Sequence, residues 1–205
     1  MDEEQTREYW DAARCEGCRH CPPRCPRFVD NRGVPWLVRP YEPSDRERLL
    51  ATYAEFAPDQ RAMGLPPLSE RALETWLDDL VDAGCNFVAT SGDRIVGHAA
   101  YTPTDAVDPE LAVFVHQDYQ NRGIGTELCE HVVAAAAAAD RDALVLEVEP
   151  GNRPAIRMYE ALGFERVGPA AGTDDVRYPM RTFGMRLPLS GAVGIEAQYP
   201  PAFRV

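Results

Sequence analysis

The chain has 205 residues, 45% of them hydrophobic, which is enough for one domain with a sizeable core. Its 33 acidic residues outnumber its 21 basic ones, all arginine, and the net charge of −12 argues against nucleic acid or an anionic membrane as a partner. No apolar run approaches the roughly 18 residues that span a membrane, and the acidic start is unlike a signal peptide. We therefore expect a cytoplasmic protein, whose lysine-free acidic surface also suits a salt-rich cytoplasm.

Three segments of the chain differ in composition. Residues 1–35 carry four of the six cysteines and little apolar sequence, so we interpret them as a Cys-rich N-terminal appendage. Residues 36–188 alternate between apolar runs and helical patterns, as one folded domain does. Residues 189–205 lack a clear period and contain a Tyr-Pro-Pro sequence, which indicates a C-terminal tail.

The first elements of the main domain are a strand and two helices. Residues 36–41 are a short apolar run, and the helical spacing that follows has Ser44 as its expected N-cap, with Glu47 completing a capping box. Ser69 is the expected N-cap of the second helix, which ends at Gly84. A Pro-rich loop through Pro66 and Pro67 connects the two helices.

A β-hairpin comes next, because residues 86–90 and 94–101 flank a Ser-Gly-Asp turn. The remaining expected elements are a strand at 111–115, a helix from the 120–125 loop to 139, a strand at 143–148, a helix at 153–162, and strands near 167 and at 181–187. This order predicts an α/β (α+β mixed sheet) fold in layers.

A glycine-containing loop joins the strand ending at Val115 to the next helix. Gly123 and Gly125 lack Cβ atoms, so a ligand can approach the backbone closely. The first amides of a helix have no partner within it, and the helix dipole makes this end positive, which favours phosphate. Arg122 is expected to add a charge-assisted contact. Neither the P-loop ending nor the three-glycine dinucleotide spacing is present.

Two motifs carry a family resemblance. Gln120-x-x-Gly123-x-Gly125 resembles the coenzyme A motif of the GNAT N-acetyltransferase superfamily, and residues 146–164 resemble that family's strand, Asn, helix Tyr and terminal Gly-Phe. The resemblance covers about residues 36–188. It implies a sheet in which two parallel strands splay apart, with acetyl-CoA bound between them as co-substrate.

The resemblance also implies roles for individual residues. Tyr159 is expected to protonate the leaving thiolate, although its position on an apolar helix face also fits a core tyrosine. Asn152 is expected to face the cofactor arm, and it also suits the N-cap of its helix. The implied cofactor contacts are Val113, Phe114 and Val115 for the pantetheine arm, Gln120, Asn121, Arg122, Gly123, Ile124, Gly125 and Thr126 for the pyrophosphate, and Asn152.

The general base has two candidates. Glu110 opens the strand before the glycine loop, where some relatives carry a catalytic Glu, and Glu149 ends the neighbouring strand. Both also fit ordinary surface acids. A water relay without a base is a further alternative.

The N-terminal cysteines have metal-ligand spacing. Their pattern equals a bacterial iron–sulfur run, and four thiolates, or three with His20, also fit zinc. A segment without metal is the third alternative. The candidate ligands are Cys15, Cys18, Cys21 and Cys25.

The function that these features predict is transfer of an acetyl group from acetyl-CoA to a primary amine, of a small molecule or a peptide, by direct attack. The alternative is a non-catalytic acyl-CoA-binding module whose Cys-rich segment docks a partner.

Overall fold

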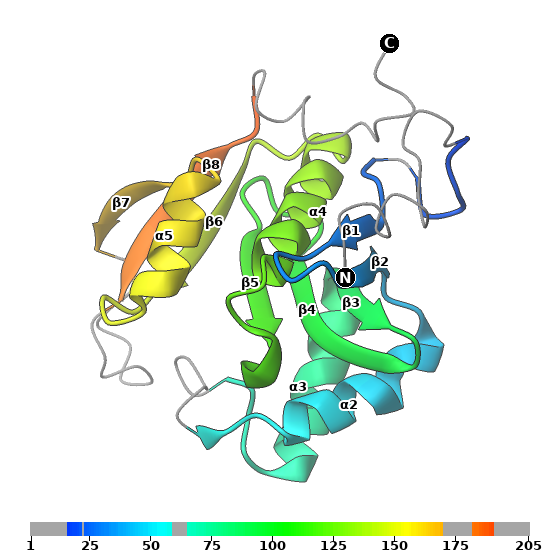
Figure 1. Ribbon diagram of the computed structural model, residues 1–205. Helices are drawn as coiled ribbons and strands as arrows, with labels where there is room; N and C mark the ends of the chain where they lie inside the picture. Colours follow the sequence, from blue (N-terminus) through cyan, green and yellow to red (C-terminus); the bar gives the residue numbers. More distant parts are fainter. Residues whose placement is uncertain (1–15, 22, 59–64, 170–181, 191–205) are drawn as a thin grey trace.

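The computed structural model describes residues 16–21, 23–58, 65–169 and 182–190 (Figure 1). The strands are β1 (Arg27–Val29), β2 (Pro35–Pro40), β3 (Cys85–Ser91), β4 (Arg94–Thr102), β5 (Glu110–Val115), β6 (Ala143–Val148), β7 (Glu165–Pro169) and β8 (Phe183–Pro188). The helices are α2 (Arg46–Ala54), α3 (Glu70–Ala83), α4 (Ile124–Ala138) and α5 (Arg153–Ala161), with 3-10 turns η2 (Pro43–Asp45) and η4 (Gln117–Tyr119). Among these helices, none is long and apolar enough to cross a membrane.

One mixed sheet contains all of these strands, in the order β1-β2-β3-β4-β5-β6-β8-β7. Its neighbours are antiparallel except for β5 and β6, which run parallel. These two strands pair only where they begin, at Glu110 and Val145, and the Val145 amide donates to the Pro109 carbonyl at 3.1 Å. Beyond this point they diverge. The predicted mixed sheet with splayed parallel strands is therefore confirmed.

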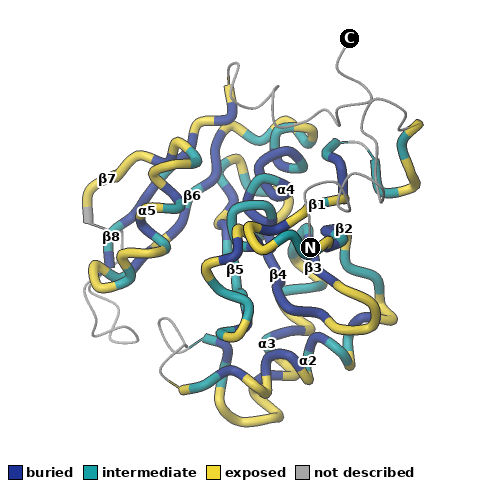
Figure 2. Tube along the Cα trace, viewed as in Figure 1, coloured by how far each residue is buried: buried dark blue, intermediate teal, exposed yellow. Residues whose placement is uncertain are grey.

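Helices cover the two faces of the sheet and give it two apolar cores. On one face, α4 and α5 pack over the strands, and alternate residues of β3 such as Phe87 and Ala89 point toward them. On the other face, α2 and α3 pack around Val88 and Ile95. Because successive strand residues point to opposite faces, β3 and β4 contribute to both cores. In Figure 2, much of α4 and of the central strands is coloured as buried.

The helix starts test the predicted caps. Ser69 Oγ accepts from the Ala72 amide at 3.3 Å and caps α3, as predicted. The prediction for Ser44 is wrong, because Ser44 lies inside η2, and the capping box there is formed by Glu42 and Asp45. Asp45 takes this place because its carboxylate is fixed by Arg39.

The first described residues pack against the main sheet. Arg27–Val29 form an edge strand that pairs with β2, and Arg24 binds Glu127 on α4 at 2.9 Å. The boundary at residue 35 stays a prediction. The predicted last strand is observed as Phe183–Pro188, and the predicted tail falls outside the described residues after Ser190.

Candidate active site

A cavity of about 540 Å³ opens where β5 and β6 diverge. This volume lies within the range of small-molecule sites. One wall comes from β5, η4 and the start of α4, and the other from the end of β6 and the start of α5. The lining residues are Val113, Val115, Tyr119, Gln120, Asn121, Gly123, Gly125, Thr126, Glu149, Gly151, Asn152, Pro154, Ala155 and Met158.

The glycine loop forms one end of this cavity. Gly123 has φ +87°, a left-handed conformation that only glycine adopts at little cost, and α4 begins at the next residue. A Cβ on Gly125 would lie 3.3 Å from Met158 Sδ, so a side chain here would narrow the cavity. The Gln120 side-chain amide donates to the Val115 carbonyl at 3.1 Å and ties the loop to β5. The amides at the start of α4 therefore face a cavity, as an anion site requires.

Three of the expected cofactor residues do not line the cavity. Phe114 points to the opposite face of the sheet, where its ring meets Tyr53 at 5.6 Å, because side chains alternate along a strand. Ile124 is buried in the core. Arg122 was expected at the anion, but its Nε donates to Asp30 at 2.6 Å instead. The other eight expected cofactor residues lie together along the walls.

Tyr159 lies on the buried side of α5 and is only 7% exposed. Its ring packs against Phe164 at 5.6 Å, and it is not among the cavity-lining residues. Burial raises the pKa of its phenol, and the neighbouring Cys129 raises this pKa further. The phenol therefore keeps its proton at neutral pH.

Three carboxylates lie along the diverging strands: Glu110 and Glu147 influence each other, and Glu149 follows the end of β6. Glu149 lines the cavity, whereas Glu110 lies at the beginning of β5, outside the lining. Although Glu110 is exposed, the protein atoms around its carboxyl desolvate it and raise its pKa, and Glu147 raises this pKa further. Glu147, which the sequence analysis did not single out, accepts a hydrogen bond from Thr182 Oγ1 at 3.0 Å. The alternation along β6 gives the signal, since Glu147 is the exposed residue between the buried Leu146 and Val148.

Asn152 has two structural roles. It lines the cavity, and its Oδ1 accepts from the Ala155 amide at 3.3 Å as the N-cap of α5. The cap that the sequence indicated is confirmed, and it fixes where the α5 wall of the cavity begins.

With this geometry in place, comparisons with known proteins assign the family. The sequence model of the acetyltransferase (GNAT) family matches residues 47–164. The chain belongs to this family. The cysteine segment and the turn at residues 30–34, which connects β1 to β2, precede the matched range.

Two curated relatives of this GNAT chain are named as acetyltransferases. The ribosomal protein bS18-alanine N-acetyltransferase of Salmonella typhimurium is 35% identical over 109 residues, which cover 52% of this chain and 69% of the relative. The mycothiol acetyltransferase of Thermomonospora curvata is 34% identical over 136 residues, which cover 63% of this chain and 44% of the relative. The chain thus spans less than half of the mycothiol enzyme.

Solved structures show the same fold. The GNAT domain of S. lividans PAT superposes with a TM-score of 0.64 at 23% identity, covering 79% of this chain and 95% of that one. A putative acetyltransferase from Salmonella typhimurium, solved with its cofactor acetyl-CoA, superposes with a TM-score of 0.59 at 18% identity, covering 77% and 95%. The fold class expected from the sequence is confirmed.

The cysteine segment of this GNAT protein is only partly described, and Cys15 lies outside the described residues. Cys18 and Cys21 place their Sγ atoms 3.8 Å apart, and Cys25 is buried. Within the described part of the chain, no group of three or more His, Cys, Asp or Glu residues is arranged to hold a metal ion. Neither zinc nor an iron–sulfur cluster is supported by these residues.

Proposed function

We propose that this GNAT protein transfers an acetyl group from acetyl-CoA to a primary amine of a small molecule or a peptide. The observation that carries the proposal is the cavity between β5 and β6, which has the start of α4 at one end and the carboxylate of Glu149 in its lining. A thioester donor with a phosphate-bearing tail matches that arrangement.

The donor site relies on backbone atoms. The amides from Gln120 to Thr126 donate hydrogen bonds to the pyrophosphate, which explains how a protein of net charge −12 binds a polyanion. Val113 and Val115 give the pantetheine arm an apolar wall, and Asn152 faces it from α5.

Tyr159 supplies the proton for the leaving group. The acceptor nitrogen attacks the thioester carbonyl, the C–S bond breaks, and the departing sulfur takes a proton from the phenol. Because burial raises its pKa, the phenol is protonated at neutral pH and holds a proton when the sulfur departs. The phenolate then recovers the proton that the nitrogen releases.

The proton from the amine passes through the carboxylates at the splay. Glu110 is the first candidate, since a raised pKa brings a carboxyl closer to neutral pH, where a general base is effective. Glu149 is the second candidate because it lines the cavity. Glu147 assists Glu110, because its charge raises the pKa of that carboxyl.

The acceptor approaches from the face of the sheet opposite α4 and α5. Phe114, Glu110 and Glu147 share this face by strand alternation. One relative is named for a protein's alanine and the other for the small thiol mycothiol, so both a peptide amine and a small-molecule amine remain as acceptor classes. We expect the loop at residues 63–68 to contact the acceptor; its residues 65–68 are described, and Leu68 is highly exposed.

The test has two steps. Acetyl-CoA is titrated into the protein in a calorimeter, in dilute buffer and in molar potassium chloride, and micromolar binding is expected in at least one. A panel of primary amines and N-terminal peptides is then incubated with acetyl-CoA, and free CoA thiol and acetylated product are measured. Binding without any product would favour the non-catalytic module, and no binding by folded protein would refute the donor site.

A further inference from the structure

The basic residue of the glycine loop is used inside the protein. Arg122 is 8% exposed, and its guanidinium lies over the rings of Trp36, at 5.1 Å, and Tyr119, at 5.5 Å. Its Nε donates to Asp30 Oδ2 at 2.6 Å. Asp30 is 92 residues away in sequence, on a turn after β1 that precedes the range matched by the family. The charge of Arg122 is therefore committed to this turn and not to the cavity.

Asp30 is itself held rigidly. Its carboxylate accepts from the amides of Arg32 and Val34, both at 2.9 Å, and from Trp36 Nε1 at 2.8 Å. Burial alone would raise the pKa of this carboxyl, but the hydrogen bonds from Val34, Trp36, Arg32 and Arg122 lower it overall. An ionised, fully bonded aspartate makes a fixed anchor for the guanidinium.

The same turn holds two further points of the loop. The Asn31 amide donates to the Arg122 carbonyl at 3.3 Å, and Asn31 Nδ2 donates to the Asn121 carbonyl at 2.9 Å. Asn121 lines the cavity with φ +56°, a conformation that a non-glycine residue adopts at a cost. Phe28, on β1, lies where a Cβ on Gly123 would come within 3.2 Å of its ring. Residues 28–31 thus contact three consecutive residues of the loop from outside.

We propose that the turn at residues 30–33 positions the pyrophosphate loop, with Asp30 acting through Arg122 as a positioning residue for the acetyl-CoA site. The inference rests on the proposed function and extends its donor site beyond the family's matched range. The loop binds with backbone amides, and such a site depends on the amides being aimed before the ligand arrives. Arg122 also packs on Tyr119, which lines the cavity, so the anchor reaches the wall as well as the loop.

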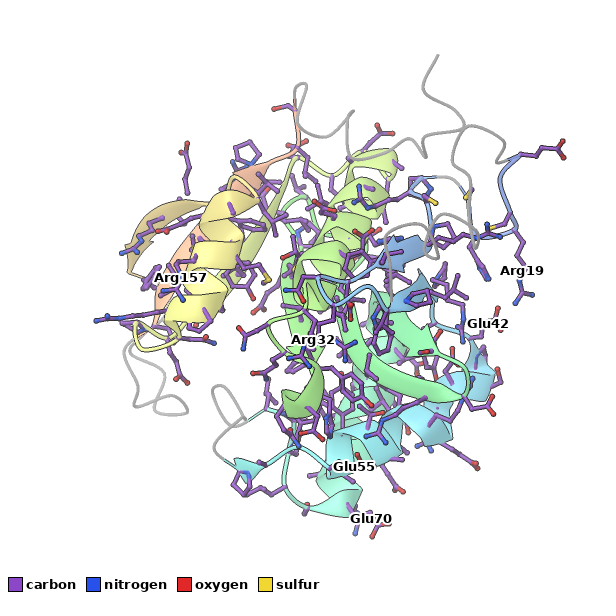
Figure 3. The ribbon with its side chains drawn as sticks, in the orientation of Figure 1. Arg19, Arg32, Glu42, Glu55, Glu70 and Arg157 are labelled. Atoms are coloured by element: carbon purple, nitrogen blue, oxygen red, sulfur yellow. The ribbon has the colours of Figure 1, made fainter. Side chains whose placement is uncertain are left out.

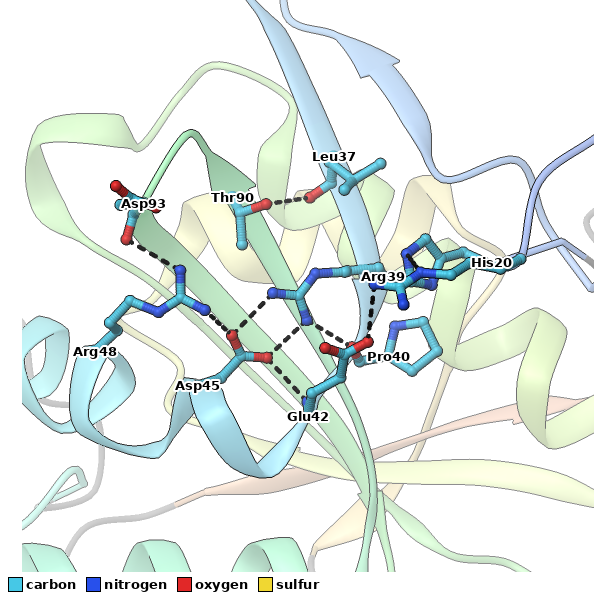
Figure 4. Close-up of polar contacts among 10 residues, drawn as sticks. His20, Leu37, Arg39, Pro40, Glu42, Asp45, Arg48, Thr90 and Asp93 are labelled. Carbon is cyan, nitrogen blue, oxygen red and sulfur yellow. Dashed lines mark hydrogen bonds and ion pairs between the residues drawn. The ribbon is translucent and has the colours of Figure 1, made fainter.

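The chain contains a matched control for this pair. Asp45 is also buried and accepts from Arg39 at 2.6 and 2.8 Å and from the Glu42 amide at 2.9 Å (Figure 4). Arg48 is a further partner. The Arg39–Asp45 pair joins β2 to η2, and none of its residues lines the cavity. Figure 3 shows Arg32, which marks the other turn, in a different part of the molecule from Glu42.

The experiment compares Asp30→Asn with Asp45→Asn. Melting temperature and the Kd for acetyl-CoA, by calorimetry, are measured for both and for the unaltered protein. We expect both variants to have a lower melting temperature, because each leaves a buried arginine without its charge partner. We expect only Asp30→Asn to bind acetyl-CoA more weakly, by about tenfold. Equal binding by Asp30→Asn and the unaltered protein, or equal weakening in both variants, would overturn the inference.

Two further variants test the route and guard against misfolding. If Asp30 acts through Arg122, the combined Asp30→Asn and Arg122→Met change weakens binding less than the two single changes added in log Kd. Additive losses would contradict that route. Asn31→Ala removes one exposed side chain, folds even if Asp30→Asn does not, and is expected to weaken binding about threefold; unchanged binding would count against the turn. Absence of binding by the unaltered folded protein would instead refute the proposed function itself.

Discussion

The β5 wall and the β6 wall of the cleft present different atoms to a ligand. Along the β5 wall and the start of α4, the proposed polar contacts are backbone amides at Gly123 and Gly125, beside the apolar side chains of Val113 and Val115. Along the β6 wall and α5, they are side chains: Glu149 and Asn152 line the cavity, and Tyr159 lies buried behind them.

The difference separates binding from chemistry. Backbone amides cannot be removed by substitution, so the polar part of the β5 wall is sensitive to changes that move the backbone or fill the space at a glycine. Proton transfer needs titratable side chains, so the β6 wall is sensitive to the loss of one functional group. Substitutions on the first wall should change Kd, and substitutions on the second should change turnover.

The largest expected effect lies on the β6 wall. Tyr159→Phe removes the proton donor and keeps the ring that packs against Phe164. We expect turnover to fall by roughly 10²–10⁴ with the Kd for acetyl-CoA nearly unchanged, because general acid catalysis contributes about that much. Steady-state kinetics with an active amine, together with calorimetry, measure both quantities. Tyr101→Phe, a change at another buried tyrosine outside the lining, serves as the control. Unchanged turnover in Tyr159→Phe would remove Tyr159 from the mechanism.

The next effect lies on the β5 wall and should appear in Kd. Gly123→Ala places a Cβ 3.2 Å from Phe28 on a residue with φ +87°. We expect acetyl-CoA binding to weaken at least about tenfold as the loop shifts. Gly92 lies in a hairpin turn, has a similar positive φ of +57° and has open space around it. Gly92→Ala should therefore lower stability and leave the Kd for acetyl-CoA unchanged. Equal Kd values for the two variants would show that the loop does not bind the donor.

Much of the fold followed from local patterns. The hairpin of β3 and β4, the strand Ala143–Val148 and the helix capped by Ser69 each have a period or a cap that a short window of sequence contains. The strand β1 has neither, because it is three residues long and two of them are exposed. The η2 cap was missed since it depends on Arg39, which is fixed only when β2 is in the sheet.

The residues of the site also divide into those that local sequence could predict and those that depend on distant residues. The glycine loop and Asn152 were predictable, since their spacing is local and their backbone roles follow from helix starts. The direction of Arg122 was not, because it is decided by Asp30, 92 residues earlier, with no local signal. The Phe114 side chain points away from the cavity, as alternation along β5 requires, since Val113 and Val115 cannot share a face with the residue between them. The expected contact of the pantetheine arm with the backbone of Phe114 stays a prediction.

Lowering the pH should reduce the stability of the core behind the β5 wall without changing the difference between the two walls. His98 is fully buried; Tyr53 donates to its Nδ1, and its Nε2 donates to Asn86 Oδ1 at 2.9 Å. Burial lowers the pKa of His98 to about 3, from about 6.5 when unfolded. Because the unfolded chain binds the proton more readily, this contribution to stability is complete above about pH 6.5 and is lost as pH falls toward 3. We expect this one proton to lower the free energy of unfolding by up to about 1.4 kcal/mol for each pH unit of acidification.

Urea unfolding at pH 7, 6 and 5 measures that slope. His98→Leu should be less stable at pH 7, since Tyr53 and Asn86 lose their partner, and should have a slope shallower by about one proton. An unchanged slope would show that His98 is not the group responsible. His131, whose pKa burial lowers to about 4, accounts for part of the remaining slope.

The smallest effect tests whether Asn152 belongs to the β6 wall as a ligand or only as a cap. Asn152→Ala removes the acceptor for the Ala155 amide and should cost about 1 kcal/mol of stability, as other N-cap losses do. Ser69→Ala removes the equivalent acceptor at the start of α3, far from the lining, and should cost a similar amount without changing Kd. Asn152→Ser keeps a capping oxygen and shortens the side chain. If Asn152 also contacts the donor, Asn152→Ser retains stability and binds acetyl-CoA a few-fold more weakly; if its Kd matches that of Ser69→Ala, the side chain serves α5 alone, and the side-chain contacts of the β6 wall reduce to its carboxylates and Tyr159.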